Sequence, residues 1–264
     1  MNEQVNGKKI LITGASNGIG MYLAIHVARN GGIPILVARS EGKLEVIANE
    51  LKRRYGVECH WYRADLSNDD EWKDVSDQIL FVHDRIDALI NNAGLGVFDR
   101  FNESAWQDID RMLEVNVKAV MRATHQLLPH FLLQKHGHII NIASQAGKMA
   151  TPKSAVYSAT KHAVLGFTNA LRMEVQTEGV FVTSVNPGPV RTNFFNVADP
   201  SGNYAASVDR LMIDANRLAR VIVDALFQPV REINLPRWME AGSKLYNMTP
   251  ATMEKLMKKQ FEKK

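Results

Sequence analysis

Tyr157 and Lys161 are the residues whose types and spacing most directly suggest chemistry. Of the six tyrosines in this 264-residue chain, only Tyr157 is followed by a lysine four positions later. Residues with this spacing share one face of a helix. An ammonium group beside a phenol favours the phenolate and lowers the phenol pKa from its ordinary value of about 10. The pair therefore predicts an acid–base group that could deliver a proton to a carbonyl oxygen.

Ser144 could complete this group. It directly follows a strand predicted over His138–Ala143, and open parallel sheets bind ligands at the carboxyl ends of their strands. Its hydroxyl could then hold the reacting oxygen beside the Tyr157 phenol. A serine in this position can equally be an ordinary turn residue.

A glycine-rich turn predicts a site for a phosphate group. The segment Thr13 to Gly20 joins the first predicted strand to a predicted helix. Gly14 would allow a tight turn, Gly18 a close approach of the backbone to a pyrophosphate, and Gly20 close packing of helix on strand. The N-terminus of the helix offers N–H groups and a partial positive charge to the phosphates. The alternative is a tight turn without a ligand.

The end of the second predicted strand indicates which dinucleotide would bind. NAD sites usually place a carboxylate there to accept from the ribose 2′-hydroxyl, whereas this chain has Arg39 and Ser40 and no acid before Glu41. Arg39 could pair with a 2′-phosphate, and Ser40 could donate to it. The sequence thus predicts NADP(H) in preference to NAD(H), unless Arg39 is merely a solvated loop residue.

The elements that must position these residues alternate between strands and helices. Continuous apolar strands are typical of a parallel sheet that is buried on both faces, and strict alternation favours a doubly wound fold. We expect a three-layer α/β Rossmann fold, with a seven-stranded, mostly parallel sheet and three helices on each face. The predicted strands are Lys9–Thr13, Ile33–Ala38, Glu58–Ala64, Ile86–Asn91, His138–Ala143, Val180–Val185 and Glu232–Leu235. The predicted helices are Ile19–Arg29, Gly42–Tyr55, Asp70–Val82, Trp106–Gln134, Ala155–Thr177 and Val208–Phe227.

Two further segments complete this predicted single domain of residues 1–264. The stretch 188–207 has no clear period, and a loop of this length is often a functional lid. Its apolar residues, with those past the last strand, could shape a substrate pocket or simply pack on the sheet; they are Phe194, Phe195, Val197, Trp238, Met239, Leu245, Tyr246 and Met248. The basic tail, about 250–264, contains one amphipathic stripe over Met253–Phe261. This stripe could dock on a neighbouring subunit, which we favour, on an acidic partner or on an anionic membrane surface.

Composition excludes several classes of protein. The formal charge of +4 is concentrated in the last eleven residues, where five lysines face two glutamates, so no basic face for nucleic acid is expected. Cys59 is the only cysteine, and no apolar run is long enough to span a membrane. The eight histidines form no metal-binding motif. We therefore expect a cytoplasmic protein without a metal.

Several motifs together resemble the short-chain dehydrogenase/reductase superfamily, over about Lys8 to Leu235. The glycine motif matches Thr13 to Gly20, and the family's Asn-Asn-Ala-Gly motif matches Asn91 to Gly94. The four catalytic positions fall on Asn116, Ser144, Tyr157 and Lys161. The resemblance implies that Tyr157 is the acid/base and that Ser144 orients the substrate. It also implies that Lys161 binds the nicotinamide ribose and lowers the tyrosine pKa, and that Asn116 holds a water in a proton relay.

The resemblance also implies the residues that bind the cofactor. Asp65 and Leu66 match the segment beside the adenine, and Pro187 to Thr192 matches the segment beside the nicotinamide. Some NADP-preferring relatives carry a basic residue where this chain has Asn17, so the 2′-phosphate would depend on Arg39 and Ser40. The full set of cofactor positions is Gly14, Ser16, Asn17, Gly18, Ile19, Gly20, Arg39, Ser40, Asp65, Leu66, Asn92, Ala93, Gly94, Tyr157, Lys161, Pro187, Gly188, Val190 and Thr192.

These observations predict an NADP(H)-dependent oxidoreductase that acts on a small-molecule ketone, aldehyde or secondary alcohol. A 3-oxoacyl-(acyl-carrier-protein) reductase is an alternative, in which the lysine-rich tail would meet an acidic carrier. A cofactor-sensing protein without catalysis is a further alternative, which the presence of Ser144, Tyr157 and Lys161 disfavours. Relatives are commonly oligomers, so a homodimer or homotetramer is expected.

Overall fold

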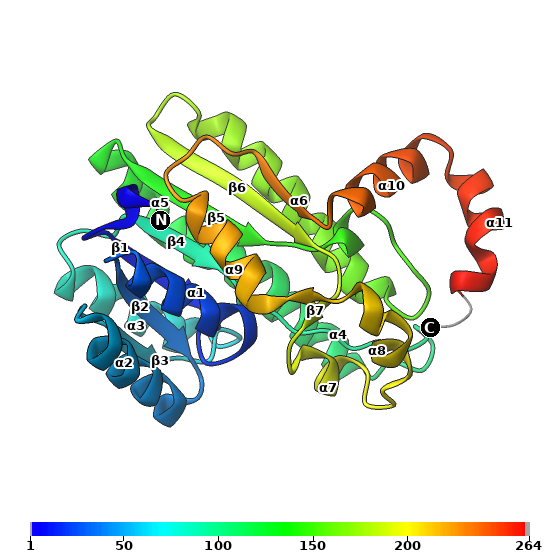
Figure 1. The fold of residues 1–264 in the computed structure, drawn as a ribbon, viewed down its shortest axis with the longest axis horizontal. Coiled ribbons are helices and arrows are strands. Elements are labelled where there is room, and N and C mark those ends of the chain that lie inside the picture. The colour runs from blue at the N-terminus through cyan, green and yellow to red at the C-terminus, as the bar shows by residue number, and fades with distance from the viewer. Residues whose placement is uncertain (1, 262–264) are drawn as a thin grey trace.

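The structure is a computed structural model that describes the backbone of residues 2–261 and the side chains through residue 256. Its main sheet has seven strands in the order β3-β2-β1-β4-β5-β6-β9 (Figure 1), and every neighbouring pair is parallel. These strands are β1 (Lys9–Thr13), β2 (Ile33–Ala38), β3 (His60–Arg63), β4 (Ala88–Asn91), β5 (Gly137–Ile142), β6 (Val180–Pro187) and β9 (Glu232–Leu235). The predicted doubly wound fold is confirmed, and its main sheet is entirely parallel.

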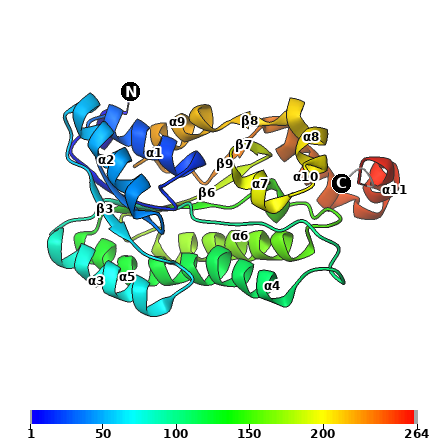
Figure 2. The same ribbon diagram turned by 90° about the horizontal axis from the view of Figure 1, so that it is seen from below.

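Three long helices cover each face of the sheet (Figure 2). One face carries α1 (Gly18–Arg29), α2 (Glu41–Tyr55) and α9 (Ala215–Asp224), and the other carries α3 (Asp69–Val82), α5 (Ala119–Gln134) and α6 (Ala155–Val175). Alternate residues of β1 point into the two layers: Ile10 and Ile12 pack in one core, Leu11 in the other, and all three are fully buried. Burial on both faces explains why the strands are apolar without alternation.

The strand order reverses between β1 and β4, which are neighbours in the sheet although two strands separate them in the sequence. Connections leave this point toward opposite faces, so the carboxyl ends of β1 and β4 border a crevice. Polar contacts tie the two ends together there. The Asn92 side-chain amide donates to the carbonyl oxygens of Thr13 (3.0 Å) and Gly14 (3.2 Å), and the Asn92 N–H donates to Thr13 Oγ1 (3.0 Å). The fold therefore places the glycine turn beside the Asn-Asn-Ala-Gly segment.

Two predicted helices differ from the structure. The helix predicted over Trp106–Gln134 is interrupted by a π-helical turn (Glu114–Lys118) between α4 (Trp106–Leu113) and α5. The helix predicted to begin at Val208 begins at Ala215, because Asp214 caps it by accepting from the Arg217 N–H at 2.7 Å. Residues 209–214 instead contain a 3-10 turn (Asp209–Leu211) and the short strand β8 (Ile213–Asp214).

The segment 188–207 contains regular structure that its sequence pattern does not reveal. It holds β7 (Val190–Arg191), which pairs with β8, followed by α7 (Phe194–Ala198) and the start of α8 (Asn203–Val208). Helices of five or six residues are too short to display a helical period. The remaining short elements are the 3-10 turns Glu3–Val5 and Gln145–Gly147.

Two helices follow β9 at one end of the molecule (Figure 1). α10 (Arg237–Met248) packs near the carboxyl ends of the strands, and α11 (Pro250–Phe261) extends away from the sheet. The last three residues of the predicted tail lie outside the described residues. None of the helices in the described part of the chain is both long enough and apolar enough to cross a bilayer.

Candidate active site

The glycine turn between β1 and α1 has the geometry of a phosphate cradle. Gly14 has a φ of +66°, and a Cβ there would lie 2.8 Å from Ala93 Cα. A Cβ at Gly20 would lie 2.3 Å from the Gly14 carbonyl oxygen, so the helix can approach the strand only without a side chain. The turn therefore brings the N–H groups at the start of α1 to the crevice, where they can receive an anion.

A cleft of about 470 Å³ runs along the carboxyl edge of the sheet from this turn. It brings together most of the predicted cofactor positions, from the glycine turn, the end of β2, the end of β3 and the segment after β4. The predicted positions that line it are Gly14, Ser16, Asn17, Gly18, Ile19, Arg39, Ser40, Asp65, Leu66, Asn92, Ala93, Gly94 and Thr192. Gly20 lies behind the turn, and Tyr157, Lys161, Pro187, Gly188 and Val190 line a second, adjoining pocket instead.

The end of the cleft near β2 is cationic. The Arg39 side chain is 59% exposed, and its guanidinium lies 4.0 Å from Asp65. Burial opposes ionisation of Asp65, but hydrogen bonds from Ser67 and the nearby arginines hold the pKa of this carboxyl below its ordinary value. The Lys43 Nζ lies 3.4 Å from Asn17 Oδ1. Sequence reasoning missed Lys43, although its position in the first turn of α2, four residues after Arg39, was a usable signal.

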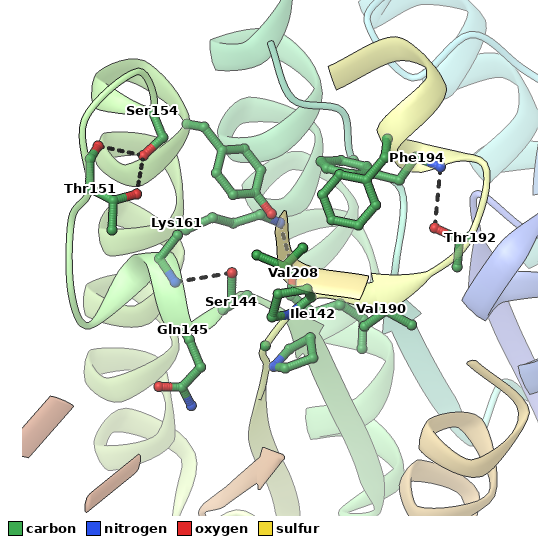
Figure 3. Close-up of a pocket in the computed structure, with 18 of the residues that line it drawn as sticks. Ile142, Ser144, Gln145, Thr151, Ser154, Lys161, Val190, Thr192, Phe194 and Val208 are labelled. Carbon is green, nitrogen blue, oxygen red and sulfur yellow. Dashed lines mark hydrogen bonds between the residues drawn. The ribbon is translucent and has the colours of Figure 1, made fainter. Parts of the chain in front are cut away.

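The adjoining pocket, of about 260 Å³, contains the predicted catalytic residues. Ser144 follows β5 and caps a 3-10 turn, where its Oγ accepts from the Ala146 N–H at 3.0 Å. Tyr157 and Lys161 lie one turn apart on α6, and the Lys161 Nζ is 5.7 Å from the centre of the Tyr157 ring. Figure 3 shows Ser144 and Lys161 in this pocket with Phe194 of α7 opposite them.

Burial shifts the two titratable groups in opposite directions, because it disfavours the charged form of each. It raises the pKa of Tyr157 to about 12, although a hydrogen bond with Ser144 acts in the opposite direction. It lowers the pKa of Lys161 to about 8. The predicted lowering of the phenol pKa is therefore wrong for this structure, since desolvation outweighs every contact that favours the phenolate. At neutral pH the phenol carries its proton.

Lys161 and Asn116 are held by backbone groups. The Lys161 Nζ donates to the carbonyl oxygen of Ile142 at 2.9 Å. Asn116, fully buried in the π-helical turn, accepts from the Leu95 N–H (2.9 Å) and donates to the Leu95 carbonyl oxygen (2.8 Å) and to Thr160 Oγ1 (3.1 Å). Asn116 thus joins the segment after β4 to α6. A π-helical turn is a frequent feature of functional sites.

The rest of the pocket is mostly apolar and includes several aromatic rings. The Phe98 ring meets the Tyr157 ring edge-on at 5.6 Å, and Phe194 lies 5.8 Å from Tyr157. Met239 of α10 contributes its thioether, which lies so close to Gly188 that a Cβ there would be 2.5 Å from the sulfur. The remaining apolar lining residues are Ile19, Ile142, Ala143, Ala146, Met149, Pro187, Pro189, Val190, Phe195, Tyr204, Val208 and Leu211.

Several pocket predictions need correction. Among the described apolar side chains past the last strand, Met239 lines the pocket, while those of Trp238, Leu245 and Met248 are exposed. Val197 does not line this pocket but lines the cleft along the carboxyl edge of the sheet. Sequence reasoning missed Phe98 and Tyr204; isolated aromatic residues in irregular segments give no pattern. Within the described part of the chain, no cluster of three His, Cys, Asp or Glu side chains is arranged to bind a metal.

The fold and the site together define a nucleotide-binding α/β protein with a tyrosine–lysine–serine group. The family model described as short chain dehydrogenase matches residues 8–201. The chain therefore belongs to the short-chain dehydrogenase family of oxidoreductases.

Known relatives agree with this membership. The chain is 33% identical to the 3-oxoacyl-(acyl-carrier-protein) reductase of Staphylococcus epidermidis over 193 residues, which cover 72% of this chain and 78% of that protein. It is similar in structure to a short-chain dehydrogenase from Sphingobium yanoikuyae in complex with NADPH, with a TM-score of 0.80, 28% identity and coverage of 92% and 95% of the two chains. A short-chain dehydrogenase/reductase from Burkholderia phymatum in complex with NAD has a TM-score of 0.84, 27% identity and coverage of 96% and 97%. These relatives support a nicotinamide cofactor.

Proposed function

We propose that this protein is an NADP(H)-dependent carbonyl reductase or alcohol dehydrogenase in which Tyr157 is the general acid/base. The observation that carries the proposal is the junction of the two cavities. Both cavities are lined by Gly94, Thr192 and Phe194. One of the two is the apolar pocket, which also contains Ser144 and Tyr157. A substrate carbonyl in the apolar pocket would thus lie between a proton donor and the end of the nucleotide cleft.

The residues of the cleft fit a nicotinamide dinucleotide. The glycine turn would supply N–H groups for the pyrophosphate, Asp65 and Leu66 would contact the adenine, and Lys161 of the adjoining pocket would bind the nicotinamide ribose. When bound, the cofactor supplies or accepts the hydride. The cations Arg39 and Lys43 at one end of the cleft support NADP(H) in particular, because both suit a 2′-phosphate.

The catalytic residues would act on the substrate oxygen. Ser144 would donate a hydrogen bond to it, and the Tyr157 hydroxyl would transfer its proton to it during reduction. The protonated phenol found at neutral pH is the form that this step requires. Lys161, whose pKa is about 8, would return a proton toward the phenolate, and Asn116 would hold a water in that relay. Oxidation of an alcohol would run through the same groups in reverse.

Substitution of Tyr157 by phenylalanine tests this assignment. We expect Tyr157→Phe to lower kcat at least about 100-fold, since positioned acid–base groups contribute roughly 10²–10⁴ in rate. The assay follows NADPH absorbance with a panel of ketones, aldehydes and 3-oxoacyl thioesters. Tyr246→Phe is the matched control, because the Tyr246 hydroxyl bonds Glu254 on α11. Wild-type activity in Tyr157→Phe would refute the assignment.

A second candidate substrate is a 3-oxoacyl group on an acyl carrier protein, favoured by the 33% identity to a reductase of that kind. The same panel separates the two candidates. A kcat/KM for 3-oxoacyl thioesters well above that for simple ketones would support the second.

The proposal also assigns a role to the segment 188–207 as a lid over the substrate in a single-domain enzyme of residues 1–264. Phe194, Phe195 and Tyr204 of this segment line the pocket, which supports the assignment. A homodimer or homotetramer and a cytoplasmic location stay predictions.

A further inference from the structure

One face of α10 carries an apolar stripe that the described part of the chain leaves uncovered. Trp238, Leu245 and Met248 are 58%, 51% and 79% exposed, and Ala241 between them is exposed too. Positions 238, 241, 245 and 248 fall on one side of a helix. In α11, Leu256 is 74% exposed. We call Trp238, Ala241, Leu245 and Met248 the C-terminal apolar stripe.

The opposite face of α10 is fastened to the body of the protein. Met239 lines the substrate pocket and Ser243 is buried. Glu240 accepts from Lys148 at 2.6 Å, and Lys148 also donates to Glu232 of β9 at 2.5 Å. The stripe therefore points away from the protein because the other side of the same helix forms part of the pocket wall.

The charges around the stripe are cationic. Arg237 and Lys244 are exposed and border the stripe by helical spacing. Glu240 lies in ion pairs with Lys148 and Lys244, while Glu254 accepts a hydrogen bond from the Tyr246 hydroxyl and keeps its negative charge. The last eleven residues contain five lysines and two glutamates. An apolar face with tryptophan and leucine beside lysine and arginine is the composition of helices that lie in a membrane interface.

We propose that α10 and α11 dock the protein on the surface of an anionic lipid bilayer. The apolar stripe would enter the boundary between headgroups and acyl chains, and Arg237 and Lys244 would face the lipid phosphates. A second copy of this chain fits less well, because a twofold contact would bring identical cationic helices together. Docking on α10 would place the wall of an apolar substrate pocket at the bilayer, which suits a substrate that dissolves in lipid.

Co-sedimentation of the full chain with vesicles tests the proposal without any substrate or cofactor. The two vesicle types are pure phosphatidylcholine and phosphatidylcholine with about a third phosphatidylglycerol. We expect binding to the second and at least about tenfold weaker binding to the first, since each basic residue near an anionic surface contributes about 1 kcal/mol. Raising the salt to about 1 M, where the Debye length is about 3 Å, should release the protein.

A double variant tests the stripe itself. Trp238→Ser/Leu245→Ser should weaken binding to the anionic vesicles about tenfold or more, because two large side chains would no longer be buried. Phe81→Ser/Leu133→Ser is the matched control, since Phe81 on α3 and Leu133 on α5 are 90% and 87% exposed but lie outside the stripe. Activity on a water-soluble ketone should be the same in both variants.

Three results would overturn the proposal. The first is the absence of sedimentation with anionic vesicles, and the second is equal vesicle binding by the stripe variant and the wild type. The third is a dimer that the stripe variant converts to a monomer without any effect of vesicles, which would assign the stripe to a second copy of the chain. None of these results depends on whether the proposed enzymatic activity is correct.

Discussion

Tyr157 and Lys161 illustrate how burial sets the protonation of a site. The same loss of solvent raises the pKa of the phenol to about 12 and lowers that of the ammonium to about 8. The Tyr–Lys spacing alone suggested a lowered phenol pKa, because spacing reports proximity and not desolvation. The structure describes a neutral phenol beside an ammonium that is easily deprotonated, which is the arrangement of a proton donor with a nearby proton source.

Under the proposed function, two further single side chains, Arg39 and Lys43, would decide the choice of cofactor. Charge-assisted hydrogen bonds contribute about 1.5–3 kcal/mol each, which corresponds to roughly 10–100-fold in affinity. We expect Arg39→Ala to raise the KM for NADPH by about this factor and Lys43→Ala by a smaller one, with the KM for NADH unchanged in both. Lys52→Ala, an exposed lysine near the other end of α2, should change neither value. An unchanged NADPH-to-NADH preference in Arg39→Ala would contradict NADP(H) specificity.

Elements differ in how well the sequence predicts them. The strands were predictable because burial on both faces makes them apolar throughout, as in β1, where Ile10, Leu11 and Ile12 are fully buried. The interruption of the long helix before α5 was not, because it depends on bonds that Asn116 makes to Leu95, twenty-one residues away. The cofactor cleft was largely predictable from motifs, whereas the aromatic pocket wall depends on tertiary packing of Phe98, Phe194 and Tyr204.

His138, a fully buried residue of β5, connects three elements. Its Nδ1 accepts from the Phe227 N–H at 2.9 Å, so the proton of the neutral ring is on Nε2, which donates to Thr183 Oγ1 of β6 at 2.9 Å. Burial lowers the pKa of His138 to about 3. Protonation of Nδ1 would turn this acceptor into a donor, which would then face the Phe227 N–H, another donor.

This buried histidine predicts a pH dependence of stability. The unfolded chain takes up a proton near pH 6.5 and the folded chain only near pH 3, so stability is lost as the pH falls through this window. While only the unfolded ring is protonated, the loss is about 1.4 kcal/mol per pH unit. In urea unfolding, His138→Gln should have a lower free energy of unfolding than the wild type at pH 7. Between pH 6 and 4, its free energy of unfolding should depend less steeply on pH, by the contribution of about one proton. His125→Gln, an exposed histidine on α5, should keep the wild-type slope; a slope unchanged in His138→Gln would contradict this account.

At the scale of the whole molecule, the reversal of strand order brings together segments from nearly the full length of the chain. The glycine turn follows β1, Ser144 follows β5, and Met239 belongs to α10 near the far end of the chain. Lys148 lies just after the turn that begins with Ser144, and it joins this region to β9 and α10 through Glu232 and Glu240. Its side chain is only 13% exposed. A hydrogen bond from Gln145 to the Asn186 carbonyl oxygen of β6 (2.9 Å) holds the same turn.

The ion pairs of Lys148 with Glu232 and Glu240 should therefore stabilise the fold and also hold α10 in place as part of the pocket wall. Lys148→Met would remove the shared cation of Glu232 and Glu240, which are 19% and 16% exposed, and leave them only the longer ion pairs with Arg231 (3.7 Å) and Lys244 (3.3 Å). Removal of one partner of a buried ion pair costs about 3–5 kcal/mol, and partial exposure of these groups should place the loss in urea unfolding below this range, at about 2–3 kcal/mol. Lys73→Met, which removes an exposed pair with Asp77 on α3, should cost less than about 1 kcal/mol. Because α10 also supplies Met239 to the pocket, Lys148→Met should raise the KM for a bulky ketone more than the KM for NADPH. Equal losses of stability in the two variants would show that the ion pairs of Lys148 stabilise the fold no more than an ordinary surface ion pair.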